Sequence, residues 1–173
     1  MTTRTAAARH AGTDSRVLLE LTNELSKKSI DKGLKSVVNI LRRISENYTW
    51  LGIYLVKDDS LVLAAYAGEG ETEHVQIPIG QGICGLAAKQ AETIIVPDVN
   101  KDPRYLMCFP STRSEIVVPI RGTASVLGEI DIDSDRPSAF TKYDQDLLEQ
   151  AATILGEYLQ TQRISLEPSK DSL

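Results

Sequence analysis

The sequence predicts an α+β fold: a six-stranded antiparallel sheet with the N- and C-terminal helices on one face and a small helix and a loop on the other. Apolar residues recur at helical spacing near both ends of the chain. Between them, short runs rich in Val and Ile are separated by turns, which is typical of hairpins. A single short helical segment interrupts these strand-like runs.

The helices are predicted from their apolar stripes. We expect a first helix from Asp14 and a second from Ser29. Their stripes consist of Val17, Leu18, Leu21 and Leu25, and of Leu34, Val37, Val38, Leu41 and Ile44. A last helix opens near Thr141, because Asp144 three residues later completes a capping-box variant.

The strands are predicted from runs of β-branched and aromatic residues between turn signals. They cover residues 50–56, 61–66, 74–77, 93–96, 116–120 and 126–134. A short helix is expected through residues 84–89. Residues 97–113, which include several prolines, are expected to form an irregular loop beside the pocket.

The last hairpin concentrates acidic side chains close to a cysteine, Cys108. Side chains alternate along a strand, so Asp131 and Asp133 share a face. If the turn is centred near Thr123, Glu115 lies opposite Asp131. Because opposed like charges destabilise a hairpin, this face is either solvated or used to hold a cationic or protonatable group. Both interpretations stay open, since Arg residues close in sequence offer neutralising partners.

Composition excludes several classes of function. The 173 residues are 42% hydrophobic and 25% charged, which is typical of one soluble globular domain. The net charge of -5 argues against a nucleic-acid surface, and no apolar run reaches membrane-spanning length. The start lacks the apolar region of a signal peptide, so we expect a cytoplasmic protein. We expect a flexible N-terminus over 1–13, one domain over 14–161 and a frayed tail over 162–173.

Two cysteines, Cys84 and Cys108, are present. In a reducing compartment they are either inert buried thiols or a redox pair. Cys84 lies near the start of the short helix, where backbone N–H groups would lower its pKa. The cysteines and the two histidines show no metal-ligand spacing, so no metal site is expected.

Four motifs together resemble one family. They are Gly80-Gln81-Gly82-Ile83-Cys84-Gly85, Val96-Pro97-Asp98-Val99, Cys108 with the later Ser114-Glu115, and Gly128-Glu129-Ile130-Asp131-Ile132-Asp133-Ser134. The combination resembles GAF domains, which have a PAS/profilin-like fold, and within them the free methionine-(R)-sulfoxide reductases. The resemblance covers roughly residues 14–161.

The resemblance implies reduction of free L-methionine-(R)-sulfoxide to methionine by a cysteine nucleophile at Cys108. The substrate-binding residues it implies are Glu115, Asp131, Asp133, Trp50 and Tyr54. Thioredoxin would recycle the resulting disulfide, and no metal or organic cofactor would be required. With only two cysteines, Cys84 is the natural resolving partner, although the two roles could be reversed.

The residues suit this chemistry. Sulfoxide reduction needs an attacking thiolate, an acid for the departing oxygen and a second thiol to clear the sulfenic acid. Crowded carboxylates raise one another's proton affinity, so one can stay neutral and donate. The remaining negative charge suits the ammonium of a free amino acid, which a peptide-bound residue lacks.

Two departures from the family leave alternatives open. Many members carry a third cysteine where this chain has His74, and the loop before Cys108 is shorter and differently charged. One alternative is a non-catalytic GAF module that binds a small metabolite. Another is a homodimer formed through the first and last helices, which would serve a signalling role.

Overall fold

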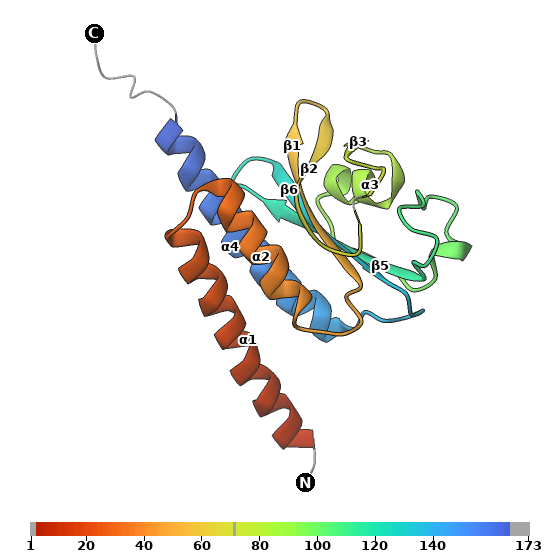
Figure 1. The fold of residues 1–173 in the computed structure, drawn as a ribbon, viewed down its shortest axis with the longest axis horizontal. Helices are drawn as coiled ribbons and strands as arrows, with labels where there is room; N and C mark the ends of the chain where they lie inside the picture. Colours follow the sequence, from red (N-terminus) through yellow and green to blue (C-terminus); the bar gives the residue numbers. More distant parts are fainter. Residues whose placement is uncertain (1–2, 71, 167–173) are drawn as a thin grey trace.

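One antiparallel sheet with helices on both of its faces forms the centre of the molecule (Figure 1). The computed structural model describes residues 3–70 and 72–166. The elements are α1 (Thr3–Ser26), α2 (Ile30–Arg42), β1 (Trp50–Lys57), β2 (Ser60–Gly68), β3 (Gln76–Pro78), α3 (Gly82–Gln90), β4 (Ile94–Val96), the 3-10 turn η1 (Val99–Lys101), β5 (Ser114–Arg121), β6 (Val126–Ser134) and α4 (Lys142–Leu166). The strand order is β3-β2-β1-β6-β5-β4, which confirms the predicted fold class.

Each face of the sheet carries its own apolar core. Helices α2 and α4 cover one face and bury Leu51, Ile53, Ile130 and Ile132. The opposite face lies under α3 and buries a smaller cluster. Because strand side chains alternate, the residues between those of the first core point toward α3. The sheet therefore separates a structural core from the face that carries the acidic residues.

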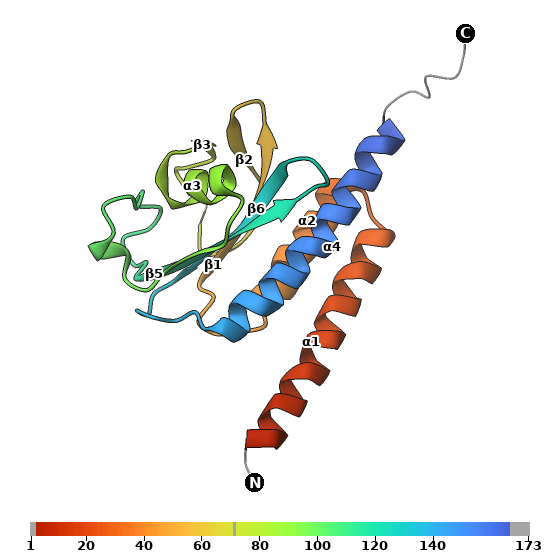
Figure 2. The same ribbon diagram turned by 180° about the vertical axis from the view of Figure 1, so that it is seen from behind.

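Helix α1 forms an outer layer that packs on α2 and α4 (Figure 2). It begins at Thr3, so the predicted helix start at Asp14 is wrong; residues 1–2 of the expected flexible segment lie outside the described residues. The early turns are rich in alanine, the strongest helix former, which explains the extension. Within the described residues, no helix combines the length and apolar character needed to cross a bilayer.

The start of α4 has the predicted cap. The backbone N–H of Thr141 donates to Asp144 Oδ2 at 2.8 Å, and the Thr141 hydroxyl donates to the same oxygen at 2.6 Å. The Tyr48 hydroxyl donates to Asp144 Oδ1 at 2.7 Å, which ties the entrance of β1 to the helix. Helix α4 continues to Leu166, beyond the predicted start of the frayed tail, and residues 167–173 lie outside the described residues.

The β5–β6 hairpin has a different register from the predicted one. Glu115 pairs with Asp133, and Asp131 pairs with Val117. A bulge between Ile120 and Arg121 adds a residue beside the turn, so the symmetric turn centred on Thr123 is wrong. The displacement along β6 is two residues, an even number, so the three carboxylates keep a common face.

Candidate active site

The acidic face predicted from the hairpin is buried rather than solvated. Glu115, Asp131 and Asp133 are 2%, 0% and 1% exposed. Of the two arginines close in sequence, Arg113 is exposed and Arg121 donates to the carbonyl of Ala91. Among the described residues, none of these carboxylates belongs to an ion pair. The solvated interpretation is therefore excluded, and the charge of this face needs protons or a cation from outside.

A fourth carboxylate, Glu129, completes the group and was missed in the sequence. It is 0% exposed and lies on β6 two residues before Asp131, so alternation places it on the same face. The same alternation rule applied one step further would have found it. We refer to Glu115, Glu129, Asp131 and Asp133 together as the acid nest.

The acid nest is electrostatically strained. Burial raises the pKa of Glu129 to about 8, and burial followed by the charge of Glu129 raises the pKa of Asp131 to about 8. Burial and the neighbouring carboxylates raise the pKa of Glu115 and of Asp133 well above their usual range. Seven carboxylate oxygens of the nest have no hydrogen-bond partner among the described residues. At neutral pH the nest therefore retains protons unless a cation enters it.

The thiol of Cys84 borders this nest. Its Sγ donates to Glu115 Oε1 at 3.7 Å. Burial, and then the charges of Asp131 and Glu129, raise the pKa of Cys84 well above its usual range. The prediction that the start of α3 lowers this pKa is therefore wrong. Desolvation and nearby negative charge outweigh the weak field of a helix start, whose effect is limited to the first turn.

The donor atoms of Cys84, Glu115 and Asp131 all lie within 4.8 Å of one another, a spacing that could hold a metal ion. Sequence spacing gave no sign of this cluster, because its members come from three separate elements. The expectation of a metal-free site stays a prediction.

Cys108 approaches the same space from the 97–113 loop. Its half-buried Sγ lies 3.6 Å from the carbonyl of Leu106. Cys108, Cys84 and Glu115 line one cavity of about 10 Å³, room for roughly a single water molecule. Burial and the charges of Asp131 and Asp133 raise the pKa of Cys108. The two thiols therefore border one small cavity, which in this conformation is too small for an amino-acid substrate.

Trp50 lies at the open end of the acid nest. Its ring packs against Phe109 of the loop, with centroids 5.6 Å apart, and stacks on Tyr66 at 6.2 Å. A cleft of about 480 Å³ is lined in part by Trp50, Phe109 and Asp133. The sequence-predicted aromatic wall thus borders the nest at Asp133.

Tyr54 and His74 anchor the loop rather than face the cleft. The buried Tyr54 hydroxyl donates to the carbonyl of His74 at 3.1 Å, and His74 Nε2 donates to the carbonyl of Met107 at 3.2 Å. These contacts connect β1 to the residue next to Cys108. They also explain why β3 begins at Gln76 rather than at the predicted His74, whose carbonyl is bonded to a side chain.

Comparison with known proteins places the chain in a family. Residues 5–159 match the GAF domain model. The chain is 35% identical over 125 residues to GAF domain-containing protein A of Dictyostelium discoideum, covering 70% of this chain and 78% of that protein. It is 35% identical over 112 residues to the free methionine-R-sulfoxide reductase of Escherichia coli, covering 65% and 67%.

Solved structures agree with this result. The free methionine-R-sulfoxide reductase of Neisseria meningitidis, solved in complex with its substrate, has a TM-score of 0.82 and 30% identity, with 90% of this chain and 93% of that chain covered. The type II enzyme of Thermoplasma acidophilum has a TM-score of 0.73 and 36% identity, with 82% and 96% covered. The chain belongs to the GAF-domain family of free methionine-R-sulfoxide reductases. The resemblance found in the sequence, and the oxidoreductase class it implied, are confirmed.

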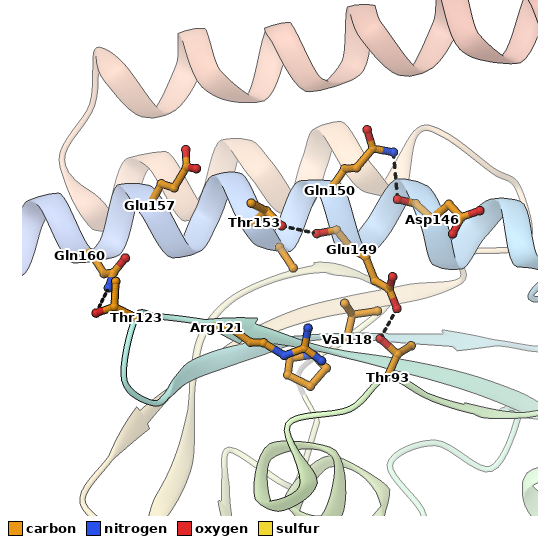
Figure 3. Close-up of a pocket in the computed structure, with 13 residues that line it drawn as sticks. Thr93, Val118, Arg121, Thr123, Asp146, Glu149, Gln150, Thr153, Glu157 and Gln160 are labelled. Carbon is orange, nitrogen blue, oxygen red and sulfur yellow. Dashed lines mark hydrogen bonds between the residues drawn. The ribbon is translucent and has the colours of Figure 1, made fainter.

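A large cavity of this GAF domain lies away from the acid nest. It measures about 810 Å³ and opens between α4 and β5 (Figure 3). Thr93 donates to Glu149 across it at 2.7 Å, and Gln160 donates to Thr123 at 2.9 Å. Neither cysteine and no carboxylate of the nest lines it. Its size alone therefore does not mark it as the reductase site.

Substituting Gly52, which pairs with Asp131, tests the position of the aromatic wall. A Cβ added there would lie 2.7 Å from Cζ3 of the Trp50 ring, so Gly52→Ala must displace the indole. We expect the KM for methionine sulfoxide to rise about tenfold, and kcat to change less, because substrate contact rather than thiol chemistry is lost. Steady-state kinetics measure both constants. An unchanged KM in Gly52→Ala would contradict the proposed wall.

Proposed function

We propose that this chain reduces free L-methionine-(R)-sulfoxide to L-methionine with its own two thiols. The observation that carries the proposal is the acid nest, which is buried without a basic partner among the described residues and is bordered by Cys84 and Cys108. The Neisseria meningitidis structure supports the proposal, since that related enzyme was solved in complex with its substrate.

The acid nest selects the substrate by charge. An ammonium group placed among buried carboxylates removes part of their mutual repulsion and supplies partners for oxygens that have none. A methionine sulfoxide residue inside a protein lacks this ammonium. We therefore assign Glu115, Asp131 and Asp133 to the ammonium and to proton donation, with Trp50 beside the substrate methyl group.

The same cation activates the thiols. In the free protein, burial and carboxylate charge raise the pKa of both Cys84 and Cys108. Bound ammonium offsets that charge, so each thiol loses its proton more easily once substrate is present. Substrate binding thus lowers the pKa of the thiol that attacks it.

The reaction proceeds in two steps. The Cys108 sulfur attacks the sulfoxide sulfur and takes its oxygen, a neutral carboxyl of the nest supplies the proton for that oxygen, and the thiol proton replaces it on the nest. Methionine leaves, and Cys108 is left as a sulfenic acid. Cys84 then attacks that sulfur, a disulfide forms and water leaves. Thioredoxin returns the disulfide to two thiols.

Position favours Cys108 as the nucleophile. Cys108 is half-buried on a loop that must move to admit substrate, whereas Cys84 is buried beneath it on α3. A substrate entering when the loop opens meets Cys108 first. Cys84 is then placed to follow, since both side chains line one cavity.

A thiol titration tests this function. We expect the reduced protein to lose about two thiols for each methionine formed from free methionine-(R)-sulfoxide, in the stoichiometry of a dithiol reductase. The free thiols are counted with an aromatic disulfide reagent after unfolding, and methionine is counted by chromatography. The control is the same sulfoxide within a blocked peptide, which lacks the ammonium. A rise in melting temperature with no thiol loss would instead favour the metabolite-binding module.

A further inference from the structure

We infer that Cys84, Glu115 and Asp131 form an inhibitory binding site for one divalent transition-metal ion of the Zn²⁺ class. The ion takes the place of the substrate ammonium in the acid nest. The reduction itself needs no metal, so this ion is an inhibitor and not a cofactor. The metal site goes beyond the proposed function, and only the inhibition rests on that function.

The three side chains already have the spacing of a small metal site. Sγ of Cys84 and Oε1 of Glu115 lie 3.7 Å apart, and one donor atom from each of the three residues lies within 4.8 Å of the other two. In tetrahedral zinc sites, a sulfur at about 2.3 Å and an oxygen at about 2.1 Å from the metal lie roughly 3.6 Å from each other. The first pair therefore matches zinc geometry as it stands. The other pairs need to close by at most about 1.4 Å.

The carboxylate oxygens of the site lack partners, which is an independent sign of a cationic ligand. Glu115 and Asp131 are 2% and 0% exposed. Oε2 of Glu115 and both Oδ atoms of Asp131 have no hydrogen-bond partner among the described residues. Buried polar atoms are nearly always bonded, and a buried charge needs an opposite charge. One bound ion supplies both side chains with that partner.

Regular secondary structure holds all three ligands in place. Cys84 lies on α3, Glu115 on β5 and Asp131 in the middle of β6. Zinc sites with three protein ligands leave a fourth position for water. The cavity of about 10 Å³ that Cys84 and Glu115 line has room for roughly one water molecule. The space beside these ligands therefore fits a hydrated ion's last water.

The donor set selects the kind of metal. A thiolate beside two carboxylates suits Zn²⁺ and neighbouring transition metals. Mg²⁺ and Ca²⁺ take about six or more oxygen ligands, and a cavity of about 10 Å³ has no room for the waters that would complete such a shell. Binding exchanges the thiol proton, and any proton on the two carboxyls, for the cation, so no oxidant or reductant takes part.

An ion at this position blocks the proposed reduction in two ways. It occupies Glu115 and Asp131, which the proposed function assigns to the substrate ammonium and to proton donation. It also holds Cys84, the proposed resolving thiol, as a metal-bound thiolate. Zinc and methionine sulfoxide therefore compete for one site, and a chelator restores the enzyme.

Cobalt titration of the reduced, metal-free protein tests the site, because Co²⁺ bound to a thiolate gives a charge-transfer band in the near ultraviolet. We expect this band in the wild type and its loss when Zn²⁺ displaces Co²⁺. Cys84→Ser should abolish the band. Cys108→Ser, the matched control, should keep it, since Cys108 is not among the clustered donors.

Two carboxylate variants separate a metal site from a merely negative surrounding. Asp131→Asn should raise the Kd for Co²⁺ more than about a hundredfold, because losing a group that only orients a ligand already costs about 10- to 100-fold. Asp133→Asn removes an equally buried carboxylate outside the cluster, so its Kd should change less than about tenfold. Equal losses in the two variants, a band that persists in Cys84→Ser, or no band in the wild type would overturn the site.

Activity tests the inhibition separately. At substrate concentrations below KM, free Zn²⁺ at about ten times its Kd should slow methionine formation about tenfold by mass action, and EDTA should reverse the effect. More methionine sulfoxide should raise the zinc concentration that is required. Zinc-loaded protein that works at the full rate would refute the inhibition. If metal-free wild-type protein forms no methionine, the proposed function itself fails, and the cobalt band still decides the metal site.

Discussion

Cys108→Ser protein is expected to form no methionine above background, even with thioredoxin and its reductase present. A serine hydroxyl stays protonated at neutral pH and cannot attack the sulfoxide sulfur as a thiolate does. The side chain is nearly isosteric, so the loop and the acid nest should be preserved. The measurement is methionine produced per protein chain over many minutes, together with substrate-induced change in melting temperature to show that binding persists.

Cys84→Ser is the matched variant for the other thiol. We expect about one methionine per chain, formed at nearly the wild-type rate, followed by a stop, because the sulfenic acid on Cys108 has no internal partner. Multiple turnovers with thioredoxin would rule out Cys84 as an essential resolver. The mirror result, with the single methionine formed by Cys108→Ser, would assign the nucleophile to Cys84.

Stability without substrate is expected to fall as pH rises from roughly 4 to roughly 8, the reverse of common acid denaturation. Asp131 and Glu129 have folded pKa values of about 8, far above those of an unfolded chain. Over this window the unfolded chain releases protons that the folded chain retains, so the unfolded state is favoured as pH rises. Each such group contributes at most about 1.4 kcal/mol per pH unit.

Urea unfolding at pH 5 and pH 8 under reducing conditions measures the effect. Asp131→Asn should flatten the dependence, because the amide does not titrate. Asp98 and Asp102 have pKa values lowered by hydrogen bonds from Lys101 and Arg104, so their contribution has the opposite sign but falls below this window. A stability that increases steadily between pH 5 and pH 8 would show that the nest does not retain its protons.

The sequence supported the fold and most of the site because both depend on periodicity. Alternation placed Asp131 and Asp133 on one face, and the cap at Thr141 marked the last helix. The predicted register was wrong because the turn is centred beyond Thr123 and a bulge beside Arg121 adds a further residue, and no local sequence pattern reveals either. The prediction of a lowered pKa for Cys84 was wrong for a related reason. A helix start is visible in the sequence, but burial beside carboxylates that are far away in the chain is not.

Glu129 was missed for a different reason. It was present in the motif that identified the family, and the period of two already placed it with Asp131. In the motif, Glu129 follows a glycine and reads as one more strand residue, so its charge was not counted with those of Asp131 and Asp133. Its complete burial shows that it belongs to the acid nest.

The small cavity of about 10 Å³ that the two thiols share has a consequence for the resting protein. Peroxide, the kind of oxidant that converts methionine to its sulfoxide, attacks ionised sulfur far faster than protonated sulfur. Here burial and the neighbouring carboxylates raise the pKa of both thiols and so hold them in the less reactive protonated form until a cationic substrate enters. The protein can therefore keep both thiols reduced while peroxide oxidises methionine, and the thiols are then oxidised by methionine sulfoxide rather than by peroxide.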